Sequence, residues 1–359
     1  MTTSIANLKS GERLTIRVVD PPLGQYTPLV GCWGAVRDAL LAGGMSESLA
    51  TPYFIGELDG RLVGSMGCYV PVDTMDVGLV EFVATSEEHR QKGIASALLG
   101  ALIEWFTSAG GKELNLCTSN PFAGSLYEKH GFWYSVGDGM RYLAPGAKNF
   151  GQEYLGDSGT ALVRPATWGD LPRASVLYNH AEPGWTVKDY LTSSFRDTRF
   201  ERHFINLMKG AEDHRGAVVA LESPGTSLVG LAAFHRTDSY MEQHVATLSF
   251  RVSRPYYVQA AELLEAAAQR AAELSITLLQ TYVAEGDRDQ AELLKAAGFV
   301  QEARLQDRLR TPDGLSDMLV FSRQLLGSED PIFGPGDYYA GRKAWQAERA
   351  AAGMRRQLS

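Results

Sequence analysis

In the first half of the chain, apolar residues recur with two different periods. Short runs rich in β-branched and aromatic residues predict strands, and they lie at residues 14–19, 53–58, 62–70, 77–85, 113–118, 132–136 and 140–143. Apolar residues at helical spacing predict helices within residues 27–41 and at 92–107 and 121–130. This mixture of strands and helices indicates an α/β fold built on a mixed sheet.

The second half repeats this order. Strands are predicted at 162–164, 248–252 and 277–283, and helices at 171–181 and 259–274. The run Leu228-Val229-Gly230 repeats Leu62-Val63-Gly64, and Gly298-Phe299 repeats Gly131-Phe132. A repeat of half a chain is too long for a solenoid unit. We therefore expect two related domains in tandem.

Between residues 145 and 159 the periodicity fades and glycine becomes frequent, which is typical of a linker. The expected division is a first domain at 1–147, a second at 148–326 and a tail at 327–359. Within the tail, residues 338–356 predict a helix. Its basic residues alone are a weak signal for an anionic partner, so we expect a solvated helix packed across a domain surface.

Length and composition agree with a two-domain globular protein. The chain has 359 residues, of which 45% are hydrophobic and 21% charged, values close to those of an average soluble protein. It contains no apolar run of about 18 residues, the length that a spanning helix needs. The first residues lack the charged segment and apolar block of a signal peptide. The sequence thus predicts a cytoplasmic protein without a membrane partner.

Charge and cysteine content exclude further classes. The net charge of −8 argues against nucleic acid as the main partner, because phosphate backbones need a basic surface. The chain has three cysteines without a C-x-x-C pair and seven scattered histidines, so neither a disulfide framework nor a metal site is expected.

The turn between the strand at 77–85 and the helix at 92–107 contains Gly93. At a helix N-terminus, unpaired backbone N–H groups and the positive end of the dipole can hold a phosphate or pyrophosphate. Glycine lets a bulky anion approach that backbone closely. The run around it is Arg90-Gln91-Lys92-Gly93-Ile94-Ala95.

This run resembles the pyrophosphate loop of the GNAT family of acyl-CoA-dependent N-acetyltransferases, in which Arg/Gln-x-x-Gly-x-Gly/Ala follows a strand. A second stretch resembles the other hallmark of that family, an Asn, an Ala and a Tyr ahead of Gly-Phe. The matching residues are Asn120, Ala123, Tyr127, Gly131 and Phe132. The chain is accordingly identified as a pair of tandem GNAT-like acyl-CoA N-acyltransferase domains, the second more loosely similar than the first.

The resemblance implies an acetyl-CoA site. The main chain of Val83, Ala84 and Thr85 would pair with the pantetheine arm as an added strand. Asn120 would contact the pantetheine or the acyl end, although it is an equally natural N-cap for the helix beginning at Pro121. Backbone N–H groups would cradle the pyrophosphate along Gln91, Lys92, Gly93, Ile94, Ala95 and Ser96, while the side chains of Arg90 and Lys92 would add only electrostatic attraction.

The chemistry needs an acid and a base. As the thioester breaks, the CoA thiolate needs a proton, and the resemblance assigns this role of general acid to Tyr127. The amine must lose a proton before it attacks, because free alkyl amines are mostly protonated at neutral pH. Glu81 is the candidate base, with a hydrogen-bonded structural carboxylate as the alternative. Members that acetylate protein N-termini carry a glutamate where this chain has Asn115, close to Glu113.

The second half lacks these features. It has no glycine between Val252 and Glu262, Leu294 replaces Tyr127, and Asp287 replaces Asn120. Proline at position 255 also removes a backbone donor from the turn. We therefore expect a degenerate domain that supports the first or shapes its acceptor pocket.

The expected function is transfer of an acetyl group from acetyl-CoA to a primary amine of a small molecule by direct attack, in a monomer or homodimer. Protein lysine or N-terminal acetylation is one alternative, and a non-catalytic acyl-CoA-binding regulator is another. Aromatic residues near the acceptor end can either line a pocket or fill the core. They are Trp33, Tyr53, Tyr69, Trp133 and Tyr134.

Overall fold

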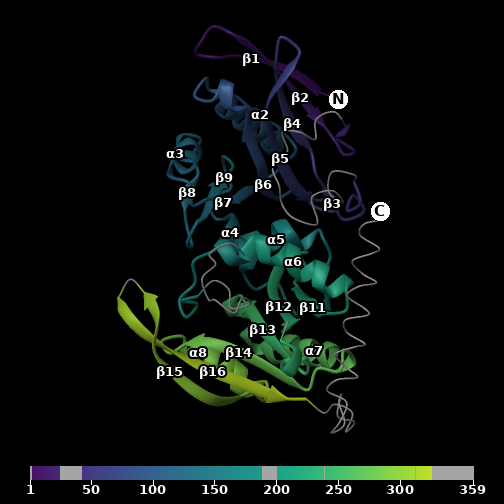
Figure 1. The fold of residues 1–359 in the computed structure, drawn as a ribbon, viewed down its shortest axis with the longest axis vertical. Helices are drawn as coiled ribbons and strands as arrows, with labels where there is room; N and C mark the ends of the chain where they lie inside the picture. The colour runs from purple at the N-terminus through teal and green to yellow at the C-terminus, as the bar shows by residue number, and fades with distance from the viewer. Residues whose placement is uncertain (1, 25–42, 188–199, 238, 312, 326–359) are drawn as a thin grey trace.

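The computed structural model describes residues 2–24, 43–187, 200–237, 239–311 and 313–325 (Figure 1). The helix expected within 27–41, the aromatic candidate Trp33 and the tail at 327–359 lie outside these residues.

The first half forms a mixed sheet of nine strands in the order β1-β2-β4-β5-β6-β7-β9-β8, with β3 paired to β5. All pairs are antiparallel except β6 with β7. The strands are β1 (Thr2–Asn7), β2 (Arg13–Val19), β3 (Leu49–Ala50), β4 (Tyr53–Leu58), β5 (Arg61–Pro71), β6 (Val77–Thr85), β7 (Glu113–Cys117), β8 (Trp133–Tyr134) and β9 (Gly139–Leu143).

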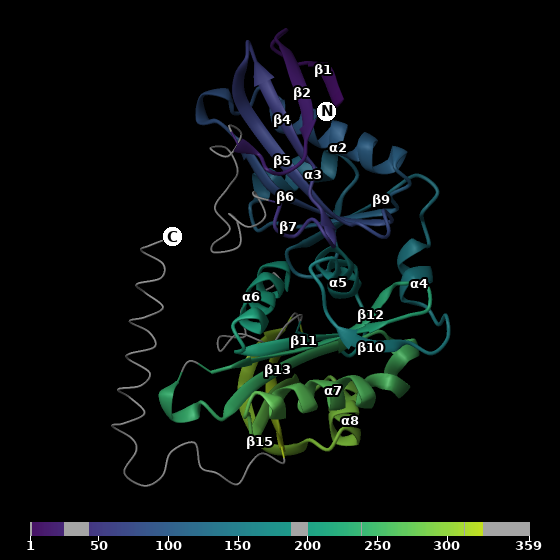
Figure 2. The same cartoon turned by 90° about the vertical axis from the view of Figure 1, so that its right-hand side faces the viewer.

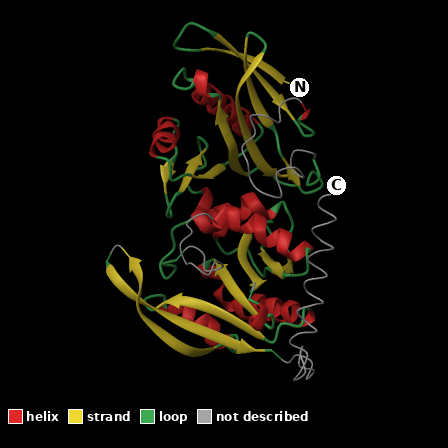
Figure 3. Ribbon diagram, in the orientation of Figure 1, coloured by secondary structure: helices red, strands yellow, loops and turns green. Residues whose placement is uncertain are grey.

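Two helices of the first half pack beside this sheet, α2 (Ile94–Ser108) and α3 (Pro121–Lys129) (Figures 1 and 3). The helix α2 buries Ile94, Leu98, Leu102 and Phe106, which recur three to four residues apart and so line one face. The helix α3 begins where it does because Asn120 caps it, with its Oδ1 accepting a hydrogen bond from the Phe122 N–H at 3.0 Å.

The second half forms a sheet of seven strands in the order β10-β11-β12-β13-β14-β16-β15. Position by position this matches β2-β4-β5-β6-β7-β9-β8, and the parallel pair β13–β14 corresponds to β6–β7. The predicted fold class, two tandem α/β units, is confirmed. The strands are β10 (Leu162–Pro165), β11 (Gly216–Glu222), β12 (Leu228–Arg236), β13 (Val245–Val252), β14 (Leu278–Ala284), β15 (Val300–Thr311) and β16 (Gly314–Gln324).

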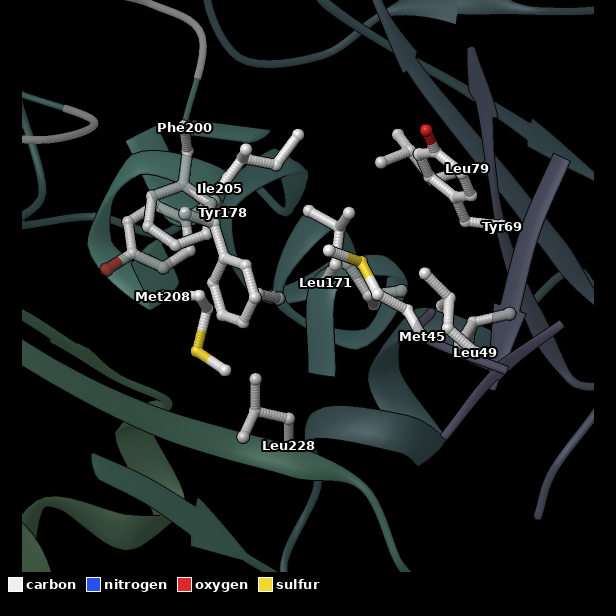
Figure 4. Close-up of a cluster of buried hydrophobic side chains, with 14 of the residues drawn as sticks. Met45, Leu49, Tyr69, Leu79, Leu171, Tyr178, Phe200, Ile205, Met208 and Leu228 are labelled. Carbon is white, nitrogen blue, oxygen red and sulfur yellow. The ribbon is translucent and has the colours of Figure 1, made fainter. Parts of the chain in front are cut away.

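The helices α5 (Asp170–Asn179) and α6 (Phe200–Glu212) of the second half lie between the two sheets, whereas α7 (Ala260–Glu273) and α8 (Arg288–Ala296) cover the far side of the second sheet (Figure 2). All ten residues of α5 are buried. Tyr69 and Leu79 of the first sheet share one hydrophobic cluster with Leu171 and Phe200 of these helices (Figure 4). The second half therefore supplies part of the core of the first.

A network of buried, hydrogen-bonded side chains also connects the two halves. The guanidinium of Arg141 donates to both carboxylate oxygens of Glu113, at 3.0 and 2.7 Å. The amide of Asn115 donates to Glu113 at 3.0 Å and accepts from Asn179 of α5 at 3.1 Å, and Asn179 also donates to Glu201 of α6 at 3.2 Å. Because unpaired buried polar groups are costly, this hydrogen-bond network fixes the position of α5 on the first sheet.

The structure contains elements that the sequence analysis did not predict. The stretch expected to be a linker contains a helix, α4 (Phe150–Leu155), which buries Tyr154 and Leu155. The strand β1 and the long hairpin β15–β16 were not predicted. Apolar and polar residues alternate only weakly along these strands, because β15 in particular exposes most of its residues. None of the helices among the described residues is long and apolar enough to cross a membrane.

Candidate active site

The turn before α2 has the backbone of an anion site. Gln91 and Gly93 both adopt left-handed conformations, with φ of 66° and 90°, so consecutive N–H groups turn toward one side. Gly93 is the N-cap of α2, and no side chain among the described residues caps this helix. A Cβ atom built on Gly93 would meet nothing within 4 Å. Open space thus borders the backbone at the start of α2, which suits a phosphate group.

Charged and polar side chains around this turn are held by neighbours. The Lys92 ammonium pairs with Glu12 at 3.2 Å, and the exposed Arg90 pairs with Glu87 at 3.4 Å. Ser96 Oγ shares a hydrogen bond of 2.7 Å with His130 Nε2 at the end of α3, and burial lowers the pKa of His130. The main chain, rather than the lysine or arginine, is therefore the preformed part of the turn.

Beside this turn, β6 has a bulge in its pairing with β5, and its pairing with β7 ends early. The parallel ladder of β6 with β7 ends at Leu79, opposite Asn115. Just beyond, Phe82 takes φ of 53°, and the pairing with β5 gains one residue on β6, so that Glu81 lies opposite Gly67 and Ala84 opposite Ser65. Val83, Ala84 and Thr85 form the end of β6 past the bulge. This end of β6 diverges from β7, as an added strand of ligand requires.

Tyr127 comes from α3 and is buried, 5% exposed, with its ring 5.8 Å from that of Phe132. Burial raises the pKa of Tyr127 above its ordinary value, and the negative charge of Glu81 raises it further. The phenol is thus protonated at neutral pH and is electrostatically coupled to the carboxylate that the sequence analysis selected as base. Tyr127 thus lies close enough to feel the charge of Glu81, and the catalytic roles of both residues stay predictions.

The other carboxylate on the neighbouring strand has a structural position. Glu113 is fully buried and bound by Arg141, and Asn115 is fully buried against Asn179. Neither faces an open site among the described residues. Asn120 acts as the N-cap that the sequence permitted and is exposed, and its role toward a cosubstrate stays a prediction.

The aromatic candidates separate into two groups. Tyr53 and Tyr69 are buried on the sheet near Glu81. Burial is the main cause that raises the pKa of both phenols, and the charge of Glu81 raises it further. Trp133 and Tyr134 are partly exposed on β8, and Trp133 lies against the guanidinium of Arg141 at 5.6 Å.

In the second half the backbone features are missing. The pairing of β12 with β13 runs from Gly230–Val252 to Arg236–Ala246 without a shift, so β13 has no bulge. A short 3₁₀ helix, Arg254–Gln259, with proline near its start replaces the glycine turn. Both parts of the site in the first half that depend on backbone geometry are therefore absent here.

Side chains fill the corresponding space in the second half. By register Arg251 takes the place of Ala84, and its buried guanidinium lies 5.6 Å from the ring of Tyr178 and 5.4 Å from that of Trp185. The Asp287 carboxylate accepts hydrogen bonds from the N–H and hydroxyl of Thr186, at 2.8 and 2.7 Å. Side chains in the second half thus occupy positions that are smaller or open in the first half, in line with the expectation of a degenerate domain.

The described residues contain no group of three or more His, Cys, Asp or Glu side chains arranged to hold a metal ion.

Comparison with known proteins gives one family. Residues 30–132 match the model of the acetyltransferase (GNAT) family. A search of curated proteins gives no match to the chain.

Similar solved structures include a ribosomal-protein-alanine N-acetyltransferase from Brucella melitensis, at 20% identity over 46% of this chain and 99% of that chain, with a TM-score of 0.38. A phosphinothricin acetyltransferase from Sinorhizobium meliloti in complex with AcCoA is 15% identical over 50% of this chain and 96% of that chain, with a TM-score of 0.40. A spermidine N-acetyltransferase from Vibrio cholerae in complex with CoA and spermine is 16% identical over 46% of this chain and 95% of that chain, with a TM-score of 0.37.

Proposed function

We propose that this chain is an N-acetyltransferase, and that its first half, which matches the model of the GNAT family over residues 30–132, transfers an acetyl group from acetyl-CoA to a primary amine of a small molecule. The observation that carries the proposal is the coincidence of three features in one half only. They are the open glycine turn, the bulged β6 and the buried phenol of Tyr127 beside Glu81. We also propose the division at residues 147 and 148, between β9 and β10.

In the proposed mechanism the turn at Gly93 binds the pyrophosphate, and the end of β6 pairs with the pantetheine arm. The amine nitrogen attacks the thioester carbonyl carbon, so a C–N bond forms and the C–S bond breaks. Glu81 accepts the proton lost from nitrogen and Tyr127 donates a proton to the sulfur leaving group. Proton return from Glu81 to Tyr127, directly or through water, restores both residues.

The position of α5 supports a small acceptor over a protein. This helix covers β5, β6 and β7 on the face that carries Glu81, and Arg173 anchors it to Asp73 of the first half at 2.6 Å. A peptide segment needs an open groove, whereas a covered face admits a small molecule. The test is a screen of small amines and of lysine peptides with acetyl-CoA, recording free-thiol release. A preference for the peptides would contradict the proposed acceptor class.

Replacing Gly93 with alanine is expected to raise the Kd of acetyl-CoA by about tenfold or more. The left-handed φ of 90° is strained for alanine, and the added methyl group projects into the space assigned to the phosphate. Calorimetric titration of wild-type protein should also give one binding site per chain.

The matched control is Gly110→Ala at the other end of α2. Gly110 has φ of 94° and open space around its Cβ position, so this variant carries similar backbone strain without touching the turn. Equal loss of acetyl-CoA affinity in both variants, or two sites per chain in the wild type, would argue against the proposed site.

Glu81→Gln is expected to lower kcat by about 100-fold or more, because an amide cannot accept the amine proton. The Kd of acetyl-CoA should stay unchanged, since the side chain of Glu81 has no proposed part in holding the cosubstrate. Single-turnover measurement over a pH series separates the chemical step from product release. An unchanged kcat would remove Glu81 from the mechanism and leave proton transfer to water.

A further inference from the structure

We infer that Tyr53 and Tyr69 form a recognition site for the ammonium form of the acceptor amine, next to Glu81 and on the face of the first sheet opposite α2. The inference rests on the proposed function and names the two residues that select a cationic acceptor.

The face is defined by packing. Tyr53, Tyr69 and Phe82 belong to the hydrophobic cluster that includes α5, whereas Tyr127 belongs to the cluster that includes α2. In Figure 4 the Tyr69 hydroxyl points away from Met45 and Leu49. Tyr127 and the tyrosine pair thus approach Glu81 from opposite faces, at the place where β6 and β7 diverge. This arrangement keeps the cosubstrate on one face and the acceptor on the other.

Gly67 lets Tyr53 reach this place. In the sheet register Tyr53 of β4 lies opposite Gly67 of β5, which in turn lies opposite Glu81 of β6. A Cβ atom on Gly67 would come within 3.0 Å of Tyr53 Cε1, so the ring lies directly over the glycine. Glycine inside a strand commonly marks such a close approach. The Tyr53 ring therefore spans the middle strand toward Glu81.

The bulge aligns the aromatic rings. Because Phe82 occupies the bulge, it shares the face of Tyr53 and Tyr69, with ring centroids 5.9 Å from each. Its ring stacks on Tyr53 at 24° and meets Tyr69 edge-on at 90°. Phe82 thus holds both tyrosine rings in place.

Among the described residues, the two buried hydroxyls have no hydrogen bond of good geometry, although they lie near each other. Each lies close enough to perturb the pKa of the other phenol. Tyr53 is fully buried and Tyr69 is 1% exposed. Buried polar groups normally have a partner. A missing partner at a proposed substrate site indicates the place of a ligand.

The chemistry of the site fits an ammonium group. Both phenols are neutral, because burial and the charge of Glu81 raise their pKa values. A phenol oxygen accepts a hydrogen bond from N–H, and aromatic faces attract cations. An ammonium group supplies three donors and a positive charge to balance Glu81. Glu81 accepts the first proton from the ammonium nitrogen and passes it to solvent. After the attack the nitrogen loses a second proton, which replaces the proton that Tyr127 gives to sulfur.

The test needs no knowledge of the natural acceptor. Two CoA thioethers serve as probes: S-(2-aminoethyl)-CoA, which presents an ammonium group beyond the sulfur, and S-propyl-CoA, which has a methyl group in the same place. Wild-type protein should bind the amino probe about tenfold more tightly. Tyr53→Phe and Tyr69→Phe should each remove most of this difference while the Kd of S-propyl-CoA stays unchanged.

Tyr282→Phe is the control, since its hydroxyl is bonded to Gln280 in the second sheet, and it should keep the full preference. Melting temperatures of Tyr53→Phe and Tyr69→Phe should equal or exceed that of the wild type, because each loses an unpaired buried hydroxyl. Gly67→Ala provides a second route, since its methyl group displaces the Tyr53 ring, and it should also reduce the preference.

The outcomes separate the two proposals. Equal affinity of wild-type protein for both probes overturns the ammonium site and leaves the acetyl-CoA site intact. A preference that survives both phenylalanine variants overturns the assignment to these tyrosines. Failure of the wild type to bind CoA or either probe overturns the proposed function itself.

Discussion

Tyr127→Phe is expected to lower kcat by about 100- to 10,000-fold, the usual contribution of a positioned general acid. Without the phenol proton, the thiolate of CoA must leave unprotonated. The Kd of acetyl-CoA should not change, since the ring and its packing against Phe132 remain. Free-thiol release under single-turnover conditions measures the chemical step, and calorimetry measures the Kd.

The pH dependence gives a second readout. Burial and Glu81 hold the pKa of Tyr127 above its ordinary value of 10.0. A group with a raised pKa keeps its proton to higher pH, so no loss of kcat from its ionisation is expected below pH 10. Tyr142→Phe, on the other side of Phe132 at 5.4 Å, is the control and should retain activity. A Tyr127→Phe enzyme with wild-type kcat would show that water or another group protonates the sulfur.

Arg141→Ala is expected to lower the free energy of unfolding by about 3–5 kcal/mol, because it leaves a buried carboxylate without its counter-charge. Glu113 is fully buried and receives two hydrogen bonds from Arg141. The loss should extend beyond the first sheet, since Glu113 also holds Asn115, which holds Asn179 of α5. Urea unfolding measures the change.

Arg270→Ala is the matched control, because the pair Arg270–Glu273 is solvent-exposed and such pairs contribute at most about 1 kcal/mol. The double variant Glu113→Leu/Arg141→Met should recover part of the stability, because it removes both buried charges. A loss below about 1 kcal/mol for Arg141→Ala would mean that Glu113 finds water or another partner.

The sequence predicted the repeated features of the fold well, and its errors have physical causes. The strands β4 to β7 and the helices α2 and α3 lie within a few residues of their predicted bounds, because buried strands form short apolar runs and the helices carry clear apolar periodicity. The helix α4 was missed because it is only six residues long and contains Gly151. The two-domain arrangement followed from the repeat, whereas nothing in the pattern indicated that α5 is buried on all sides.

For the candidate site, the motifs were sufficient to select Gly93 and Tyr127, because both features are local in sequence. The bulge at Phe82 was not predicted, since it depends on pairing with β5. For the same reason Tyr53 and Tyr69 were undecided between pocket and core. The signal that the sequence offered was Gly67, a glycine in the middle of the apolar strand that also carries Tyr69 and that lies between Tyr53 and Glu81.

The place of α5 between the sheets bears on how this duplicated protein unfolds and evolves. A helix that is core to both units couples their unfolding, so a single cooperative transition is the natural expectation for the whole chain. It also makes the second unit structurally necessary to the first. The second unit lacks the glycine turn, the bulge and the tyrosine of the first, but its deletion would expose the apolar face that carries Tyr69 and Leu79.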